Sequence, residues 1–483
     1  MRIMFVNLPY KFAISRASRW PEKTKSGTLY YPYWLCYAAG ACMDKGYDVS
    51  VIDCIARGDS REGCIKRIES FMPDYIVCET TTPTCTYDYE TIVKIKDRMP
   101  GTTFIVGGTH ATALHERVMN ECGAIDIIAR REYDFTIDDI VRNRDDLGRV
   151  RGITYRDEDK GIVVNDDRPW HENLDDLPMV SRVYEKFLNV GDYGYSLAES
   201  PMVQIFSARG CPFRCNFCSY PGTMGGRAYR KRSTMNFVDE LEYISEHMPY
   251  IKEVFIEDDT FTVDKKRVYE ICREIVRRGL DIRWSCNTRA DIPEKLMRAM
   301  KRAGCRLLVV GFESGSQKVL DETEKGIRIA DSEAFMRAAR KSRLKVFGCF
   351  MIGLKGDDRR TIEETFRLAK RLYPDMVFFQ QVVPFPGTGF YEWVREEGYL
   401  LTEKYGEWLD ERGQLRCLVK YPYADADEIE KMRDRMMSRY YFSVRYILHT
   451  ALHNFSIPEM RRIAKGAVSY FTFRMRKATG RHV

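Results

Sequence analysis

Apolar and polar positions alternate along this chain in two series of strand-like and helix-like segments. In the first series, short apolar runs rich in β-branched residues are separated by stretches with helical spacing. The predicted strands are 2–9, 48–54, 74–82, 102–108 and 125–129, and the clearest helical patterns are 34–43 and 87–99. Because strands alternate with helices, we predict a doubly wound, parallel α/β sheet over residues 1–145.

A second series follows a polar stretch. Residues 146–195 contain two short strand patterns and an acidic turn, so we interpret them as a hairpin and linker. Between residues 196 and 395, six apolar runs alternate with helical patterns: 203–208, 253–257, 283–287, 306–312, 345–352 and 376–383. Six β/α units predict an open partial barrel, with its chemistry at the carboxyl ends of the strands. Residues 396–483 are predicted to be largely helical.

Composition narrows the class of protein. A length of 483 residues accommodates two to three domains, and a hydrophobic share of 44% is sufficient for their cores. The chain has no apolar run of 18 residues, and its first residues follow a strand pattern rather than that of a signal peptide. With fifteen cysteines and no export signal, we expect a reducing, cytoplasmic compartment. The net charge of +7 is compatible with an anionic cofactor or a membrane surface.

Three cysteines lie within eight residues, directly after the first predicted barrel strand. Cys211, Cys215 and Cys218 have the spacing C-x3-C-x2-C. Each iron of a [4Fe–4S] cluster needs a ligand, so three cysteines hold three irons and leave the fourth open to a small molecule. The alternatives are buried structural cysteines and a zinc site with a fourth ligand elsewhere. The spacing favours the cluster, because zinc ligands usually come as two C-x2–4-C pairs.

Polar residues end the barrel strands that follow the cysteine triplet. The cysteine spacing resembles that of the radical S-adenosylmethionine enzymes, whose open iron binds S-adenosylmethionine, a ligand with amino, carboxylate, ribose and adenine parts. The predicted residues are, in that order, Glu257 and Asp258, Asn287 and Arg289, Glu313 and Ser314, and Ile352. Each alone would usually be a solvated strand end or a helix cap. Together, at one rim, they indicate a binding site beside the cysteines.

The strand ends of the first domain form a second candidate site, because open parallel sheets bind ligands at that edge. The residues at this edge are Asn7, Thr80, Thr81, Gly107, Gly108, Thr109 and His110. The glycine pair would allow close backbone approach, and Thr109 would begin a helix with free N–H groups. An ordinary strand-to-helix turn is the alternative. The chain has no G-x-G-x-x-G, so we do not expect a Rossmann dinucleotide site.

Several segments resemble the radical S-adenosylmethionine (radical SAM) superfamily, and specifically its cobalamin-binding class. The matching segments are 209–221, 229–233, 257–261, 287–289, 311–315 and 384–388. Within this class the chain looks most similar to the calditol-type enzymes, which build cyclitol headgroups on hopanoid and archaeal lipids. The anaerobic magnesium-protoporphyrin ester cyclase and the B12-dependent C-methyltransferases are more distant relatives.

The resemblance implies three cofactors. The cysteine triplet would ligate a [4Fe–4S] cluster, S-adenosylmethionine would bind its open iron, and cobalamin would bind at the N-terminal strand ends. Phe217 would lie near the adenine through its backbone. Reductive cleavage of S-adenosylmethionine would release a 5′-deoxyadenosyl radical that abstracts hydrogen, with flavodoxin or ferredoxin as the reductant. The D-x-H-x-x-G motif is absent around His110, so we predict no histidine ligand to cobalt.

Three functions remain open at this point. The first is carbon–carbon bond formation, as cyclisation or ring contraction, on an apolar or lipid-linked substrate. The second is B12-dependent methylation of an unactivated carbon. The third is a non-enzymatic iron–sulfur protein for electron transfer, which the convergence of polar strand ends disfavours.

The C-terminal region is basic and aromatic. Lysines and arginines far outnumber acids between residues 431 and 483, and aromatic residues lie between them. A solvated helical cap is one interpretation, and a surface that contacts anionic lipid headgroups at the inner face of the membrane is the other. We expect no nucleic-acid partner, since no motif for one accompanies the charge.

Overall fold

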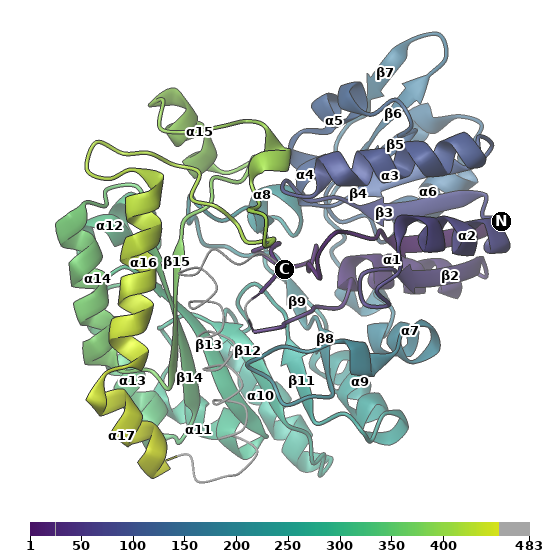
Figure 1. The fold of residues 1–483 in the computed structure, drawn as a ribbon. Helices are drawn as coiled ribbons and strands as arrows, with labels where there is room; N and C mark the ends of the chain where they lie inside the picture. Colours follow the sequence, from purple (N-terminus) through teal and green to yellow (C-terminus); the bar gives the residue numbers. More distant parts are fainter. Residues whose placement is uncertain (25, 454–483) are drawn as a thin grey trace.

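Two sheets from separate stretches of the chain form the molecule (Figure 1). The computed structural model describes residues 1–24 and 26–453, and of residues 449–453 only the backbone. The N-terminal sheet and its helices lie beside the barrel, and their strand ends meet around residues 15–20. This junction contains both sites that the sequence predicts.

The N-terminal sheet has seven strands in the order β2-β1-β3-β4-β5-β6-β7, of which the first five are parallel. The strands are β1 (Arg2–Asn7), β2 (Asp48–Asp53), β3 (Tyr75–Glu79), β4 (Thr103–Gly107), β5 (Ile127–Ala129), β6 (Ile153–Asp157) and β7 (Gly161–Val164). The strand order changes direction between β1 and β3, and ligands of such sheets bind at this switch point.

Helices cover both faces of this sheet. One face carries α1 (Tyr33–Asp44), α6 (Thr136–Arg142) and α7 (Val180–Phe187). The other carries α2 (Arg61–Phe71), α3 (Cys85–Arg98), α4 (Thr109–Ala113) and α5 (His115–Glu121). Successive residues of a strand point to opposite faces, so Phe5 joins the first core while Met4 and Val6 join the second. The predicted doubly wound sheet is confirmed.

The hairpin predicted within the linker belongs to the N-terminal sheet. β6 pairs antiparallel with β5, and β7 with β6, so the sheet extends to Val164. The sequence shows the hairpin through its two short apolar runs but carries no signal for the partner strand. Three short 3-10 turns, η1 (Leu147–Arg149), η2 (Leu174–Asp176) and η3 (Val190–Asp192), flank the path to the barrel.

Six parallel strands form the partial barrel, in the order β8-β11-β12-β13-β14-β15. They are β8 (Met202–Ile205), β11 (Glu253–Ile256), β12 (Trp284–Thr288), β13 (Cys305–Glu313), β14 (Lys345–Ile352) and β15 (Met376–Gln381). A small ribbon of β9 (Ala208–Arg209) and β10 (Arg230–Lys231) lies beside the cysteine loop. The helices are α8 (Tyr220–Thr223), α9 (Thr234–His247), α10 (Lys265–Arg277), α11 (Glu294–Arg302), α12 (Gln317–Glu322), α13 (Ile329–Lys341) and α14 (Arg359–Leu372).

The C-terminal region is only partly helical. After α15 (Gly389–Glu396), it contains η4 (Tyr405–Glu407), α16 (Ala426–Tyr441) and α17 (Val444–His453), while most of 397–425 is irregular. This irregular segment returns to the N-terminal domain, where Trp408, Leu415 and Leu418 join the core that contains Met4. Residues 454–483, on which much of the predicted basic tail falls, lie outside the described residues. In the part that is described, no helix combines the length and apolar character needed to span a bilayer.

Candidate active site

The cysteine triplet lies in the loop between β9 and α8, at the carboxyl end of the first barrel strand. Gly210, just before it, has φ +85°, and a Cβ there would lie 2.1 Å from the Ala228 carbonyl oxygen, so the tight entry to the loop requires glycine. The Cys211 N–H donates to the Gly226 carbonyl at 3.0 Å. All three cysteines are half-buried, whereas eleven of the other twelve are fully buried.

The donor set fits an iron–sulfur cluster. Three thiols on one short, partly exposed loop match the ligand number of a cluster with an open iron. Within residues 1–24 and 26–448, no three Cys, His, Asp or Glu side chains gather closely enough to share a single metal ion. A zinc site needs its ligands around one ion, whereas the three thiolates of a cluster bind three different irons and stand further apart.

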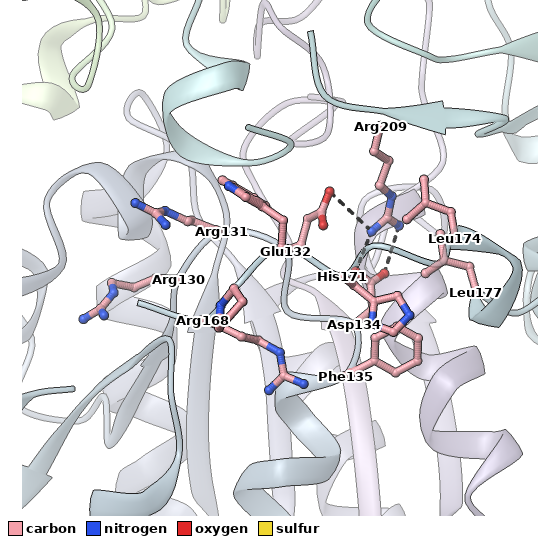
Figure 2. Close-up of a pocket in the computed structure, with 12 residues that line it drawn as sticks. Arg130, Arg131, Glu132, Asp134, Phe135, Arg168, His171, Leu174, Leu177 and Arg209 are labelled. Carbon is pink, nitrogen blue, oxygen red and sulfur yellow. Dashed lines mark hydrogen bonds and ion pairs between the residues drawn. The ribbon is translucent and has the colours of Figure 1, made fainter. Parts of the chain in front are cut away.

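A buried ion pair between the domains supports the cysteine loop (Figure 2). Arg209, two residues before Cys211, donates to both carboxylate oxygens of Asp134 at 2.6 and 2.9 Å. Its guanidinium also lies 4.6 Å from the centre of the Trp34 ring. Arg230 makes a matching pair with Glu132 at 2.6 and 2.7 Å. The cavity beside these pairs measures only about 10 Å³, space for one water molecule, so we assign it no ligand.

Two carboxylates at the rim share one arginine partner. Glu257 follows β11, and its Oε1 lies 3.3 Å from Nη1 of Arg19 while its Oε2 accepts from Gln204 at 2.9 Å. Asp259 Oδ1 lies 2.7 Å from Nη2 of the same arginine. Thr260, the residue after Asp259, has its Oγ1 3.9 Å from Sγ of Cys211, so this strand end lies beside the cysteine loop. The sequence indicates the strand end from Glu257 to Asp259 but gives no sign of Arg19.

The Asp258 side chain binds the backbone before the cysteine loop instead of pointing toward the predicted ligand. Its carboxylate accepts from the Ser207 N–H and hydroxyl, both at 2.6 Å, and from the Ala208 N–H at 3.0 Å. These bonds fix the turn between β8 and β9 and use both carboxylate oxygens. Its main-chain carbonyl accepts from Asn287 at 3.2 Å. We therefore withdraw Asp258 from the predicted contacts to S-adenosylmethionine.

Arg289 lies against the cysteine loop. Its guanidinium stacks 3.6 Å from the centre of the Phe213 ring, and Nη2 donates to the carbonyls of Lys325 and Gly326 at 2.6 and 3.1 Å. Its Nε is buried with no hydrogen-bond partner among the described residues. A buried donor without a partner is costly, and a bound carboxylate would satisfy it.

Glu313 pairs with a residue that the sequence did not reveal. Its carboxylate lies 2.7 Å from Nζ of Lys325, and both side chains are buried. Glu313 also has φ +61°, a strained value for a residue with a side chain. Because Lys325 lies in a loop after α12 without a recognisable motif, no sequence signal places it at the rim.

The other predicted rim residues, Ser314, Ile352 and Phe217, differ in burial and in their contacts. Ser314 is fully buried, and its hydroxyl accepts from the Ser316 N–H at 3.1 Å and lies 3.2 Å from the hydroxyl of Thr365, so it stabilises a turn. Ile352 is buried at the end of β14, and Phe217 is half-buried beside the cysteines. Their predicted contacts with adenine stay predictions.

The switch point of the N-terminal sheet is filled by a buried network around Arg16. This arginine pairs with Asp88 at 2.5 Å and donates to the Asn7 side chain and the Leu8 carbonyl at 2.8 and 2.7 Å. The Thr80 hydroxyl donates to the same aspartate at 2.9 Å. Asn7 and Thr80 therefore lie at the predicted edge, but their polar groups are partnered by the chain itself.

The glycine pair and His110 lie at the neighbouring strand end. A Cβ on Gly108, whose φ is +98°, would lie 2.7 Å from the Thr80 carbonyl, so close packing of β3 and β4 requires this glycine. Thr109 begins α4, and the Thr81 hydroxyl lies 3.0 Å from that of Thr84. Nδ1 of His110 lies 3.2 Å from the Thr82 hydroxyl.

His110 presents the strongest sign of a bound molecule at this edge. Its Nε2 is buried and has no hydrogen-bond partner in the described part of the chain. Burial lowers the pKa of His110 to about 3, so the ring is neutral. An orphaned ring nitrogen near a strand end fits an amide-rich ligand such as cobalamin. The ring itself packs edge-on against that of Tyr405, with the two centroids 5.1 Å apart.

The inner face of the barrel is partly open. Phe350 of β14 packs on Phe312, which contacts Phe335 of α13. The even-numbered residues of β14 therefore face the helices. Phe347 and Cys349 alternate with these residues along β14 and therefore point to the inside of the barrel. Both are half-buried, whereas the residues that point to the helices are fully buried. Phe347 stacks on Phe378 of β15 at 6.4 Å. The rim thus leads to an accessible inner wall that is largely apolar.

Family models match both halves of the chain. Residues 205–369 match the radical SAM superfamily and residues 23–140 the B12 binding domain. An uncharacterized methyltransferase of Pyrococcus horikoshii is 31% identical over 456 residues, which cover 93% of this chain and 94% of that protein. The chain belongs to the cobalamin-binding class of radical SAM enzymes. This radical SAM enzyme is also 28% identical to the anaerobic magnesium-protoporphyrin IX monomethyl ester cyclase of Cereibacter sphaeroides, over 82% of the chain and 64% of that protein.

Solved structures share the fold. The radical SAM enzyme OxsB, with aqua-cobalamin and S-adenosylmethionine bound, superposes with a TM-score of 0.70 at 17% identity over 98% of this chain and 71% of its own. TsrM from Kitasatospora setae, with cobalamin and a [4Fe–4S] cluster bound, gives 0.67 at 19% identity over 82% of this chain and 78% of its own.

These findings confirm the predicted family, its fold and its three cofactors, and they make the chain an enzyme, so the interpretation as an electron carrier is wrong. The predicted similarity to the lipid-headgroup enzymes stays a prediction.

The pKa of Glu257 predicts a pH dependence of S-adenosylmethionine binding. Burial raises this pKa to about 7, against the opposing effect of Arg19. The carboxylate that would receive the ammonium group is therefore charged above pH 7 and neutral below it. We expect affinity to fall between pH 7.5 and 6, by up to about tenfold per pH unit. Equilibrium binding to the reconstituted protein with an oxidised cluster measures this, and Glu257→Gln should flatten the profile. A flat wild-type profile would contradict the assignment.

Proposed function

We propose that this radical SAM enzyme transfers a methyl group to an unactivated carbon of a largely apolar substrate. The observation that carries the proposal is that the strand ends of both sheets meet at residues 15–20. At such a junction one substrate atom would be within reach of both cofactors. The methyltransferase name of the Pyrococcus horikoshii relative, which matches over nearly its whole length, supports the same reaction.

Each part of the bound cofactors would have its own protein residues. When bound, the cluster and S-adenosylmethionine supply the removal of a hydrogen atom from carbon, and cobalamin supplies the methyl carrier. Cys211, Cys215 and Cys218 would hold three irons and leave one open. Glu257 and Asp259 would accept from the ammonium group of S-adenosylmethionine, and its carboxylate would bind the unpartnered Nε of Arg289. Glu313, held by Lys325, would accept from the ribose hydroxyls.

The substrate would lie against the inner wall of the barrel. Phe347 and Phe378 provide flat apolar surface, and Tyr195 continues it, with its ring 4.8 Å from that of Phe255. The charged groups that act on this wall, Glu257 and Arg19 beside Tyr195, belong to the rim. We therefore expect an apolar or aromatic carbon skeleton rather than a highly charged substrate.

Isotope transfer tests the reaction type. Reconstituted enzyme, hydroxocobalamin, a low-potential one-electron donor such as flavodoxin or ferredoxin, and S-adenosylmethionine with a ¹³C-labelled methyl group are incubated anaerobically with a metabolite and lipid extract. We expect a labelled product together with S-adenosylhomocysteine and 5′-deoxyadenosine, and dependence on added cobalamin. A product formed with 5′-deoxyadenosine but without label would overturn methylation.

Such an unlabelled product would instead support the second candidate, ring formation or ring contraction on a lipid-linked substrate. The specific observation in its favour is an exposed apolar face on α17, where Val444, Ile447 and Leu448 are 72%, 54% and 56% exposed. A stretch rich in lysine and arginine follows them in the sequence, and this combination suits an anionic lipid surface. The magnesium-protoporphyrin cyclase among the relatives also catalyses ring closure, by its name.

Vesicle binding tests the lipid contact. We expect the enzyme to sediment with vesicles of anionic phospholipid but not with zwitterionic ones, and to lose most of this binding in the variant V444S/I447S/L448S, because its apolar contact is removed. Val276→Ser is the matched control, since Val276 is 57% exposed on α10, away from this face. If the wild type sediments equally with both vesicle types, or with neither, the anionic membrane contact is wrong.

A further inference from the structure

One short segment places an arginine in each of the two cofactor sites. Arg16 fills the switch point of the N-terminal sheet, and Arg19, three residues later, lies between Glu257 and Asp259 at the barrel rim. Residues 16–20 form a turn followed by a bend, and the Ser18 N–H donates to the Ser15 carbonyl at 3.1 Å, so one short, compact segment carries both arginines. A movement of one arginine is therefore transmitted to the other.

The Arg16 end is fully enclosed. Asp88 receives both the Nε and Nη2 of this arginine, at 3.3 and 2.5 Å, and its oxygens also accept from the hydroxyls of Thr80 and Thr84. The guanidinium thus occupies the strand ends at which this fold binds its ligand. A ligand that enters there competes with Arg16 for the same polar groups.

The middle of the segment is held by both domains. The Ala17 carbonyl accepts from the hydroxyl of Tyr33, in α1, and from that of Tyr220, in α8, at 2.5 Å in the latter case. Burial raises the pKa of both phenols, so they remain protonated donors at neutral pH. These bonds define a pivot between the two arginines.

The Arg19 end imitates a ligand. A cation paired with Glu257 and Asp259, at the strand end whose Thr260 contacts Cys211, stands where the ammonium group of S-adenosylmethionine would be received. Its guanidinium also lies 4.7 Å from the centre of the Tyr220 ring. The side chain is 23% exposed, in contrast to Arg16 at 2%, so this end has room to leave.

We propose that the Arg16–Arg19 segment makes the two cofactors bind in order, with Arg19 closing the S-adenosylmethionine site until cobalamin displaces Arg16. Entry of cobalamin at the switch point moves Arg16, the pivot at Ala17 withdraws Arg19, and the two carboxylates become available to the ammonium group. The two ligands then bind with positive cooperativity, and the coupling is reciprocal. The inference rests on the ammonium assignment in the proposed function.

Binding measurements without turnover test this order. The probes are S-adenosylmethionine and hydroxocobalamin, added to protein with a reconstituted, oxidised cluster. For the wild type we expect hydroxocobalamin to tighten S-adenosylmethionine binding at least fivefold, the lower end of usual coupling factors. Arg19→Gln should bind S-adenosylmethionine tightly with or without hydroxocobalamin, because its site is already open. Arg19→Lys, which keeps a cation, should keep part of the coupling.

Two further variants show whether the ammonium assignment or the ordered binding is at fault if the expected result is not obtained. Arg57→Gln, at an exposed arginine paired with Asp59, should behave as the wild type. If Glu257→Gln binds S-adenosylmethionine as the wild type does, the ammonium assignment itself fails. If Glu257→Gln weakens binding but Arg19→Gln leaves the cobalamin-free affinity unchanged, the assignment stands and the ordered binding is overturned. A wild-type affinity that does not respond to hydroxocobalamin also overturns it.

Discussion

Replacing Cys215 with alanine is expected to abolish the enzyme's reductive chemistry, with a loss of at least about 10³-fold in 5′-deoxyadenosine formation. The three cysteines act as a unit, because two thiolates leave two irons without protein ligands and the cluster does not persist. The fold should survive, since the residue lies on a partly exposed loop outside both cores. Iron content, visible absorbance and 5′-deoxyadenosine yield after anaerobic reconstitution measure the change.

The matched control for this prediction is a cysteine elsewhere in the barrel. Cys272 lies on α10 and is buried among apolar neighbours, so Cys272→Ala should keep the full iron content and activity. If Cys215→Ala retained a cluster with four irons and cleaved S-adenosylmethionine, the ligand assignment would be wrong. A loss of iron in both variants would point to general damage instead.

Replacing Asp134 with alanine is expected to lower stability by about 3–5 kcal/mol. Both side chains of the Asp134–Arg209 pair are almost completely buried, and removal of the acid leaves a buried guanidinium without its bidentate partner. Because Arg209 immediately precedes the cysteine loop, the variant should also hold its cluster less firmly. The urea midpoint of unfolding and the iron retained after gel filtration measure the two effects.

A double variant tests whether the loss of stability comes from the unpaired charge of Arg209. Asp134→Leu combined with Arg209→Met removes both charges and should recover much of the stability, since no unpaired charge remains. Arg57→Ala breaks an exposed pair and should change stability by less than about 0.5 kcal/mol. A single variant as stable as the wild type would show that the pair does not join the domains.

The architecture was predictable because it depends on local patterns. Apolar runs separated by helical spacing gave the parallel sheet and the six-stranded barrel, and the cysteine spacing located the cluster loop. Which strand a segment pairs with depends on residues far away in the sequence. The local pattern therefore indicates a hairpin within a linker at 153–164, whereas the structure has these strands as an extension of the sheet. For the same reason, the return of residues 397–425 to the first domain had no local signal.

The site was predictable only where strand ends carry a familiar motif. Glu257 follows β11 and Glu313 is the last residue of β13, and both lie at the rim. Asp258 follows the same strand as Glu257 but points to the turn before the cysteines, because successive side chains leave a strand end in different directions. Arg19 and Lys325 reach the rim from loops, and side chains from irregular segments carry no periodicity from which to predict them.

The return of residues 397–425 has a consequence for how the protein can be divided. Val383, Tyr405, Trp408, Leu415 and Leu418 complete a core whose other buried members come from the first 130 residues. The Leu415 N–H also donates to Glu22 at 2.9 Å. A polypeptide cut between residues 195 and 196 would leave the N-terminal fragment with an uncovered apolar face. The two halves are therefore interdependent folding units, and we expect the B12-type domain to be insoluble when it is expressed alone.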